Sequence, residues 1–210
     1  MSEKQIDILK SRNGKVLTLD TGDEDAYVWF ADVRVKESFQ KYLIRDRRTQ
    51  EVLEEYPLDL PDIEVETEAF YITLPDSLRR DLMAGIESGS EDDDKYLGGL
   101  HAAEHGLIAM TPREVLCDRN DLGGLSISRH DGTNEATIFV HEGIEGGVGI
   151  CKEAFESIED LIQKSLDMIT TCGCESGCPS CVYSPKCGNN NETIDKEMSV
   201  EILEKLAGSL

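Results

Sequence analysis

The first third of the chain alternates apolar and polar positions in the way that is typical of β-strands. An alternating set is formed by Tyr27, Trp29, Ala31, Val33 and Val35, and a period of two places such residues on one buried face of a sheet. A second alternating stretch covers residues 63–72 and shifts its apolar phase at Phe70, which predicts a β-bulge. Between the two, apolar residues bracket the polar segment 45–49, as in a hairpin.

Further along the chain the apolar spacing changes to three and four residues, which predicts helices. A short helix is expected over residues 76–86, and a longer one from Lys95 to about Met110. The clearest stripe consists of Ala154, Phe155, Ile158, Leu161, Ile162, Leu166 and Ile169. A last helix is indicated by Ile194, Met198, Ile202 and Leu206, which fall four residues apart.

Three shorter segments lie between these helices. Residues 117–124 look like a loop, residues 137–141 like a short buried strand, and residues 143–149, with four glycines, like a tight turn that leads into a helix.

A polar and acidic segment, residues 85–94, separates the strand-like pattern from the helical one. Such a segment is typical of an exposed loop, and we expect a domain boundary there. The prediction is a small, mostly β subdomain over residues 1–88 and a helix-rich domain over residues 95–210, which fits ordinary domain sizes. The predicted fold class is therefore α+β.

The composition is strongly acidic, with 43 Asp and Glu against 21 Lys and Arg and a formal net charge of -22. Because the acid is spread along the chain, it resembles the general acidity of proteins from a high-salt cytoplasm. Such a surface repels phosphate unless salt screens the field or basic residues gather, as Arg45, Arg47 and Arg48 do. No stretch predicts a membrane span or a signal peptide, so we expect a cytoplasmic protein with no membrane partner.

Five of the seven cysteines lie in the sixteen residues from Cys172 to Cys187. Thiols stay reduced in the cytoplasm, so clustered cysteines predict metal ligands rather than disulfides. Four thiolates with the spacing Cys172-x-Cys174-x3-Cys178-x2-Cys181 can surround one Zn²⁺ ion and close its coordination, as structural zinc sites do. Cys187 is the spare ligand and a possible substitute. An iron–sulfur cluster accepts the same donors and remains the alternative.

A second constellation is His101-Ala-Ala-Glu104-His105 on the helix predicted after Lys95. Histidines at i and i+4 share a helix face and can bind a metal ion, with the glutamate as a base, as in inverted zinc proteases. No third ligand can be chosen from the sequence, and Gly106 weakens the helix that would carry the site. Histidines that pack or form hydrogen bonds are therefore the favoured interpretation, and a metal-dependent hydrolase is the alternative.

Four segments in a fixed order resemble the MrfA-type zinc-binding domain, which forms the C-terminal domain of superfamily 2 DEAD/DEAH-box DNA helicases linked to DNA repair and also occurs in some phage-defence proteins. The segments are Gly98–His105, Leu116–Gly124 with Asp118, Arg119, Asn120 and Asp121 at its centre, Gly143–Gly149, and Cys172–Asn191. The resemblance extends over about residues 95 to 195.

The resemblance implies a structural zinc module of a 3′-to-5′ DNA helicase, with Cys172, Cys174, Cys178 and Cys181 as the zinc ligands. It also implies that ATP and DNA are handled by motor domains outside this sequence, in cis or in trans, with DNA reached through that complex. The His101, Glu104 and His105 group then becomes a family packing motif of unclear role, as does the Asp118 to Asp121 segment.

For the chain alone we predict no enzymatic activity, because no phosphate-binding G-x-x-x-x-G-K-[ST] sequence occurs in it. The competing hypotheses are the hydrolase and a purely protein-binding scaffold, which the acidic surface would also fit.

Overall fold

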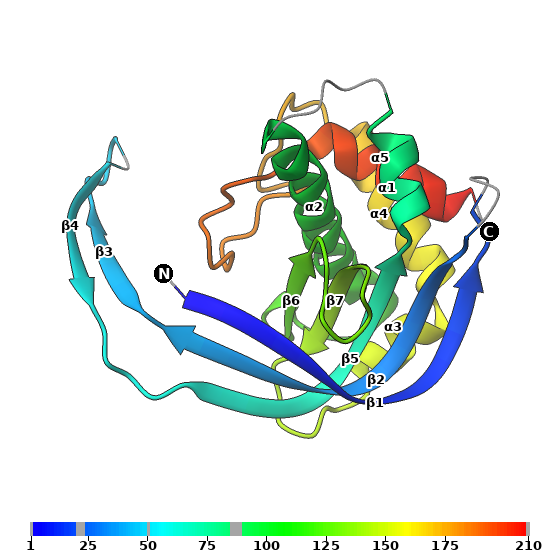
Figure 1. Ribbon diagram of the computed structural model, residues 1–210, viewed down its shortest axis with the longest axis horizontal. Helices are drawn as coiled ribbons and strands as arrows, with labels where there is room; N and C mark the ends of the chain where they lie inside the picture. Colours follow the sequence, from blue (N-terminus) through cyan, green and yellow to red (C-terminus); the bar gives the residue numbers. More distant parts are fainter. Residues whose placement is uncertain (1, 20–23, 50, 85–89, 209–210) are drawn as a thin grey trace.

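The computed structural model of the chain describes residues 2–19, 24–49, 51–84 and 90–208 (Figure 1). Within these residues, strands and helices both contribute extensively, which confirms the α+β class. The elements are β1 Ser2–Leu17, β2 Ala26–Phe39, β3 Lys41–Arg45, β4 Val52–Pro57, β5 Ile63–Leu74, α1 Asp76–Leu82, α2 Ser90–Glu114, the 3-10 turn η1 Arg119–Asp121, β6 Leu122–Ile127, β7 Ala136–Glu142, α3 Ile150–Glu156, α4 Ile158–Thr171 and α5 Lys196–Ala207.

A curved antiparallel sheet with the strand order β1-β2-β5-β7-β6 forms one layer of the described part of the molecule. Strands β3 and β4 form a separate two-stranded ribbon that projects from the far end of β2 and β5 (Figure 1). The sheet curls enough for its two edge strands to meet, since Lys4 Nζ on β1 donates to Gly124 O on β6 at 3.3 Å. None of the described helices is long and apolar enough to cross a membrane.

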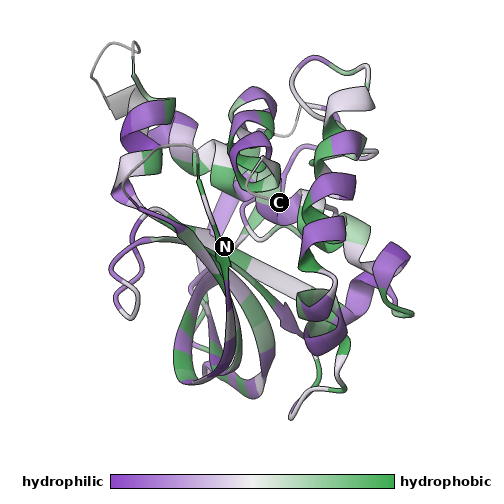
Figure 2. Cartoon of the chain, turned by 90° about the vertical axis from the view of Figure 1, so that its right-hand side faces the viewer, coloured by the Kyte–Doolittle hydropathy of each residue, from purple (hydrophilic) through white to green (hydrophobic). Residues whose placement is uncertain are grey.

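The helices pack on one face of this sheet and enclose the larger hydrophobic core (Figure 1). Val28, Phe30, Phe70 and Ile72 point from β2 and β5 into that core and are at most 3% exposed. The strands alternate hydrophobic and hydrophilic residues along their length (Figure 2), so the intervening residues point to the opposite face. There a smaller core forms from Ile6, Ala31, Val33, Val35, Ala69, Tyr71 and Phe139.

The two cores explain why the bulge predicted in β5 is wrong. The pairing of β5 with β2 runs from Ile63 to Thr73 without a shift of register. Residues 69–74 are all buried because one face of β5 packs against the helices while the other packs in the smaller core. Burial on both faces removes the apolar alternation, and the sequence pattern then imitates a phase shift. Register shifts occur instead in the pairing of β1 with β2, between Ile8 and Lys10 and between Ser11 and Asn13.

Three other expectations are corrected by the structure. Helix α2 begins at Ser90, so residues 90–94 are helical and not part of a loop. The loop expected over residues 117–124 ends at η1, because Leu122 starts strand β6, which pairs with β7. The long stripe of residues 154–169 is divided at Ser157 into α3 and α4.

The proposed boundary between residues 88 and 95 stays a prediction, and residues 85–89 lie outside the described part of the chain. Strands from both sides of it share one sheet, since β5 pairs with β7 from Ala69 to Leu74. Any two subdomains of this chain would therefore be joined by backbone hydrogen bonds as well as by side-chain packing.

Helix α2 runs across the sheet and is covered on its other side by α4 and α5 (Figure 1). Two glycines allow the close approach of these helices. A Cβ atom on Gly99 would overlap Cγ of Met198 on α5 and lie 2.8 Å from its Cβ, whereas one on Gly106 would meet Cδ1 of Ile169 at 2.9 Å. The Met198 Cβ is fixed to its backbone, while the end of the Ile169 side chain can rotate away.

We expect Gly99→Ala to lower the midpoint of thermal unfolding by about 2–8 °C. Forcing a methyl group into a packed contact costs about 1–3 kcal/mol, part of which the better helix propensity of alanine offsets. Gly106→Ala is the matched control on the same helix and should leave the midpoint unchanged or slightly higher. Calorimetry of both variants checks this, and an unchanged midpoint in Gly99→Ala would contradict the close approach of α2 and α5.

Candidate metal centre

The cysteine segment is held between the end of one helix and the start of another. Helix α4 ends at Thr171, with Cys172 as its C-cap. Helix α5 starts after Asp195, whose side chain accepts a hydrogen bond from the Met198 amide at 2.8 Å. Asp195 N also donates to Gly98 O on α2 at 3.1 Å. The segment is thus anchored to three helices.

Four of its sulfur atoms converge on one point. The Sγ of Cys172 lies 3.6 Å from that of Cys174 and 3.5 Å from that of Cys178, and the Sγ of Cys181 lies 3.5 Å from that of Cys174 and 3.7 Å from that of Cys178. Zinc–sulfur bonds of about 2.3 Å in a tetrahedron place two sulfurs about 3.8 Å apart. The donor set therefore fits one zinc ion, and we call these four residues the tetracysteine centre.

The backbone around the tetracysteine centre donates hydrogen bonds to its sulfur atoms, whereas burial raises the pKa of Cys181 to about 12. The Cys178 amide donates to Cys181 Sγ at 3.3 Å, and a hydrogen bond from the Ser180 backbone lowers the pKa of Cys178 to about 7. Gly177 has a φ of +118°, and a Cβ there would lie 2.7 Å from the side chains of Val182 and Tyr183. Only glycine satisfies both conditions without strain.

Lys196 supports the centre from α5. Its Nζ donates to the carbonyls of Cys172 and Cys174, each at 2.7 Å. Four thiolates around Zn²⁺ carry a net charge of about -2, which a nearby ammonium group stabilises. The cysteine pattern alone gave no indication of this contact between residues more than twenty positions apart.

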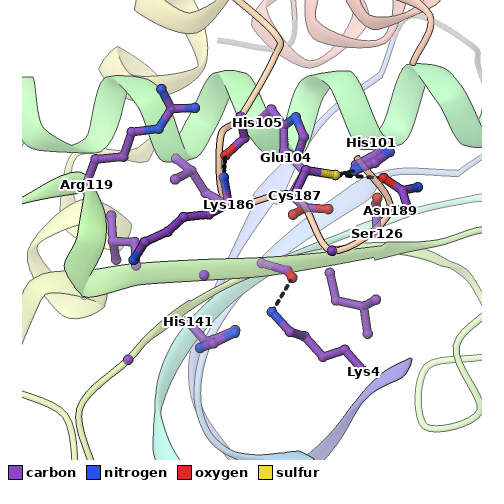
Figure 3. A pocket seen from close by; sticks show the side chains of 18 of the residues that line it. Lys4, His101, Glu104, His105, Arg119, Ser126, His141, Lys186, Cys187 and Asn189 are labelled. Atoms are coloured by element: carbon purple, nitrogen blue, oxygen red, sulfur yellow. Dashed lines mark hydrogen bonds between the residues drawn. The ribbon is translucent and has the colours of Figure 1, made fainter. Parts of the chain in front are cut away.

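Cys187, expected as a possible substitute ligand, is not among these four sulfurs. Its Sγ lies 3.3 Å from Nε2 of His101 on α2 and 2.7 Å from Oδ1 of Asn189. One ligand atom each of His101, His105 and Cys187 lies within 4.8 Å of the others. This group, which we call the His–Cys cluster, faces a cavity of about 680 Å³ between α2, β6 and the segment after the tetracysteine centre (Figure 3).

The ionisable groups of α2 are strongly affected by burial. Burial lowers the pKa of His105 to about 4, with neighbouring His101 adding to the effect, and raises the pKa of Glu104 to about 7. The Glu104 carboxylate packs against β6, where a Cβ on Gly124 would lie 2.5 Å from its Oε1. Gly124 is therefore the residue that lets the carboxylate approach the strand.

The segment from Asp118 to Asp121 shapes the turn before β6. The Asp118 side chain accepts from Asn120 N at 2.7 Å, and Asp121 Oδ2 accepts from Asp118 N at 2.9 Å, which forms a capping box around η1. Asn120 O accepts from Lys186 Nζ at 2.9 Å. Arg119 lines the cavity, and burial lowers the pKa of its guanidinium.

The sequence patterns did not single out one buried carboxylate near the glycine-rich turn. Glu142, at the end of β7, is fully buried, and its carboxylate accepts from Val148 N at 2.5 Å and from Cys151 N at 2.9 Å. It thereby occupies amides of the glycine-rich turn and of the first turn of α3. Its signal in the sequence was only an acidic residue directly before that turn.

Comparison with known proteins identifies the region that carries the tetracysteine centre. The family model of the MrfA Zn-binding domain matches residues 103–182. The uncharacterized protein MJ1572.1 of Methanocaldococcus jannaschii is 42% identical over 110 residues, which cover 51% of this chain and 98% of that protein.

Two longer relatives are helicases. The uncharacterized ATP-dependent helicase YprA of Bacillus subtilis is 28% identical over 152 residues, and the ATP-dependent helicase HRQ1 of Saccharomyces cerevisiae is 26% identical over 121 residues. These matches cover 72% and 53% of this chain but only 18% and 11% of the helicases.

Among solved structures, the DUF1998 helicase MrfA bound to DNA matches 98% of this chain with a TM-score of 0.65 at 23% identity. The match covers 25% of that helicase chain. At this level of identity the similarity establishes the fold.

We expect Cys178→Ser to remove the zinc of the tetracysteine centre and to lower the thermal midpoint by on the order of 10 °C or more. Structural zinc contributes several kcal/mol to folding, and each kcal/mol shifts the midpoint of a domain of this size by about 2–4 °C. The control is Cys117→Ser, a cysteine outside both clusters. Elemental analysis and calorimetry test this, and unchanged zinc content with an unchanged midpoint would refute a structural tetracysteine centre.

Lys196→Met should weaken zinc binding about 10- to 100-fold, as the loss of supporting groups around metal ligands does. The variant keeps the aliphatic stem while it removes the charge and two hydrogen bonds. Lys205→Met on the same helix is the control, because Lys205 pairs with Asp81 instead. Competition with a chromophoric chelator measures both affinities, and equal affinities would show that Lys196 does not stabilise the centre.

Proposed function

The chain belongs to the family of MrfA Zn-binding domains, and we propose that it is a structural zinc module of an ATP-dependent DNA helicase. In this proposal the motor domains, which bind ATP, lie outside the present sequence, in the same polypeptide or in a partner. DNA is then reached through that complex, in DNA repair or in defence. The chain spans a quarter or less of the helicases that it matches, so the activity of the whole assembly is part of the proposal.

The observation that carries the proposal is the combination of the tetracysteine centre with the fold match over nearly the whole chain. A zinc site with four protein ligands has no position for a reacting water. Its effect here is to fix the end of α4 relative to the start of α5, since Cys172 caps α4 and Lys196 on α5 binds the carbonyls of the cysteine segment. A rigid arrangement of this kind suits a module that transmits contacts within a larger motor.

The projecting ribbon of β3 and β4 supports attachment to further domains. It exposes Tyr42, Ile44, Val52, Leu53 and Tyr56, each by 41% or more. The rings of Tyr42 and Tyr56 stack on each other, and exposed apolar side chains gathered on a projecting element are typical of surfaces that contact another protein or domain. The basic residues noted in the sequence, Arg45, Arg47 and Arg48, lie at the tip of the same ribbon.

The net charge of -22 makes tight DNA binding by the chain alone unfavourable. The proposal therefore assigns DNA affinity to the assembly. The alternative hypothesis, a protein-binding scaffold without a helicase, predicts a different DNA affinity. An assembly that contains such a scaffold would bind no DNA at any salt concentration.

The test is unwinding of a partial duplex by the helicase that contains or recruits this chain. We expect Cys178→Ser to lower the unwinding rate by about tenfold or more, while Cys117→Ser keeps the wild-type rate. The chain alone should hydrolyse no ATP. The proposal would be refuted if Cys178→Ser unwound the duplex at the wild-type rate, or if the isolated chain hydrolysed ATP.

A further inference from the structure

We propose that His101, His105 and Cys187 form a second metal site, separate from the tetracysteine centre, which binds Zn²⁺ and leaves one coordination position open to the cavity. This inference goes beyond the proposed function, which requires only the tetracysteine centre. In this proposal Cys187 binds a metal ion together with His101 and His105, and it is not a fifth candidate for the tetracysteine centre.

The distances within the His–Cys cluster suit a single ion. His101 Nε2 and Cys187 Sγ are 3.3 Å apart, and zinc–nitrogen and zinc–sulfur bonds of about 2.0 and 2.3 Å in a tetrahedron place these atoms about 3.5 Å apart. The rings of His101 and His105 pack edge to face, with their centroids 4.4 Å apart. The i and i+4 spacing on α2 presents both rings to the same side, and the segment after the tetracysteine centre supplies the thiol.

A backbone carbonyl orients the imidazole of His105, as supporting groups usually do for metal-binding histidines. His105 Nδ1 is hydrogen-bonded to Val182 O at 2.7 Å, which leaves its Nε2 for a ligand. The Nε2 of His101 faces the Sγ of Cys187, and the backbone of Thr193 and Glu192 lies beside the His101 ring. His105 is therefore held through Nδ1, and the Nε2 atoms of both rings are the candidate ligands.

The surroundings of the cluster leave room for a fourth ligand. His101, His105 and Cys187 lie along the wall of the cavity, with Glu104 and Asn189 beside them (Figure 3). Two histidines and one cysteine are donors that zinc prefers, and three protein ligands with one open position characterise zinc sites that accept water or a small ligand. Arg119 and Lys186, which also line the cavity, favour an anion or a polarised group in that position.

The experiment uses the full chain with zinc already in the tetracysteine centre. Cobalt(II) is added in increments, and the visible spectrum is recorded while elemental analysis follows the bound zinc. We expect one further equivalent of Co²⁺ to bind, with the charge-transfer band of a cobalt–thiolate bond and the d–d bands of a four-coordinate ion. His101→Ala and Cys187→Ala should each abolish these bands, whereas Cys117→Ser should retain them.

The cobalt spectrum tests the second metal site without testing the proposed function. Cys178→Ser disrupts the tetracysteine centre and is not used as a probe of the second site, while His101→Ala should leave one zinc bound and the far-UV circular dichroism native. If the wild-type chain gives no cobalt–thiolate band, or if the band survives both His101→Ala and Cys187→Ala, the cluster is a hydrogen-bonded histidine–thiol group and the inference is wrong. Either result leaves the tetracysteine centre and the helicase proposal untouched.

Discussion

The burial of helix α2 between the sheet and the α4–α5 pair is the constraint on which the rest of the structure depends. Three glycines, two on α2 and one on β6, permit this burial. Gly99 and Gly106 leave room for Met198 of α5 and Ile169 of α4, and Gly124 of β6 leaves room for the carboxylate of Glu104 on α2. Because protein interiors are close-packed, the helix cannot shift at one of these contacts without disturbing the others. Its position fixes the two histidines of the His–Cys cluster and the cavity wall that the helix forms.

The same helix connects the two clusters of candidate ligands. Val182 directly follows Cys181 of the tetracysteine centre, and its carbonyl is hydrogen-bonded to His105. The backbone amide of Asp195, the N-cap of α5, donates to Gly98 O on α2. A zinc ion in the tetracysteine centre would therefore order the segment that contributes Cys187, since that segment is held at both ends by groups on α2. The proposed second site depends on the first through this backbone connection.

The family, the fold and the surface of the chain are all consistent with a module of a larger assembly. An acidic chain with a tetracysteine centre that fits zinc, and with apolar side chains exposed on a ribbon, suits the proposal of a module that works inside a larger assembly. The relatives agree with this, because the longer ones are helicases of which the chain covers only a small share. The short relative from Methanocaldococcus jannaschii, which the chain covers almost completely, shows that the similar region also occurs in a protein of about its own length.

The sequence by itself determined the α+β class, most of the helices and the four converging cysteines, because these depend on periodicity and on ligand spacing within a short loop. It could not place Cys187, since 86 residues separate it from His101 and only folding brings their side chains together. It predicted the strand β5 but added a bulge that does not exist, because burial on both faces erased the alternation. It also missed strand β6, because pairing with β7 turns a loop-like, glycine-containing segment into a strand. Local patterns reveal what neighbouring residues form, whereas the His–Cys cluster, the support from Lys196 and the carboxylate of Glu142 were decided by contacts between distant segments in the tertiary structure.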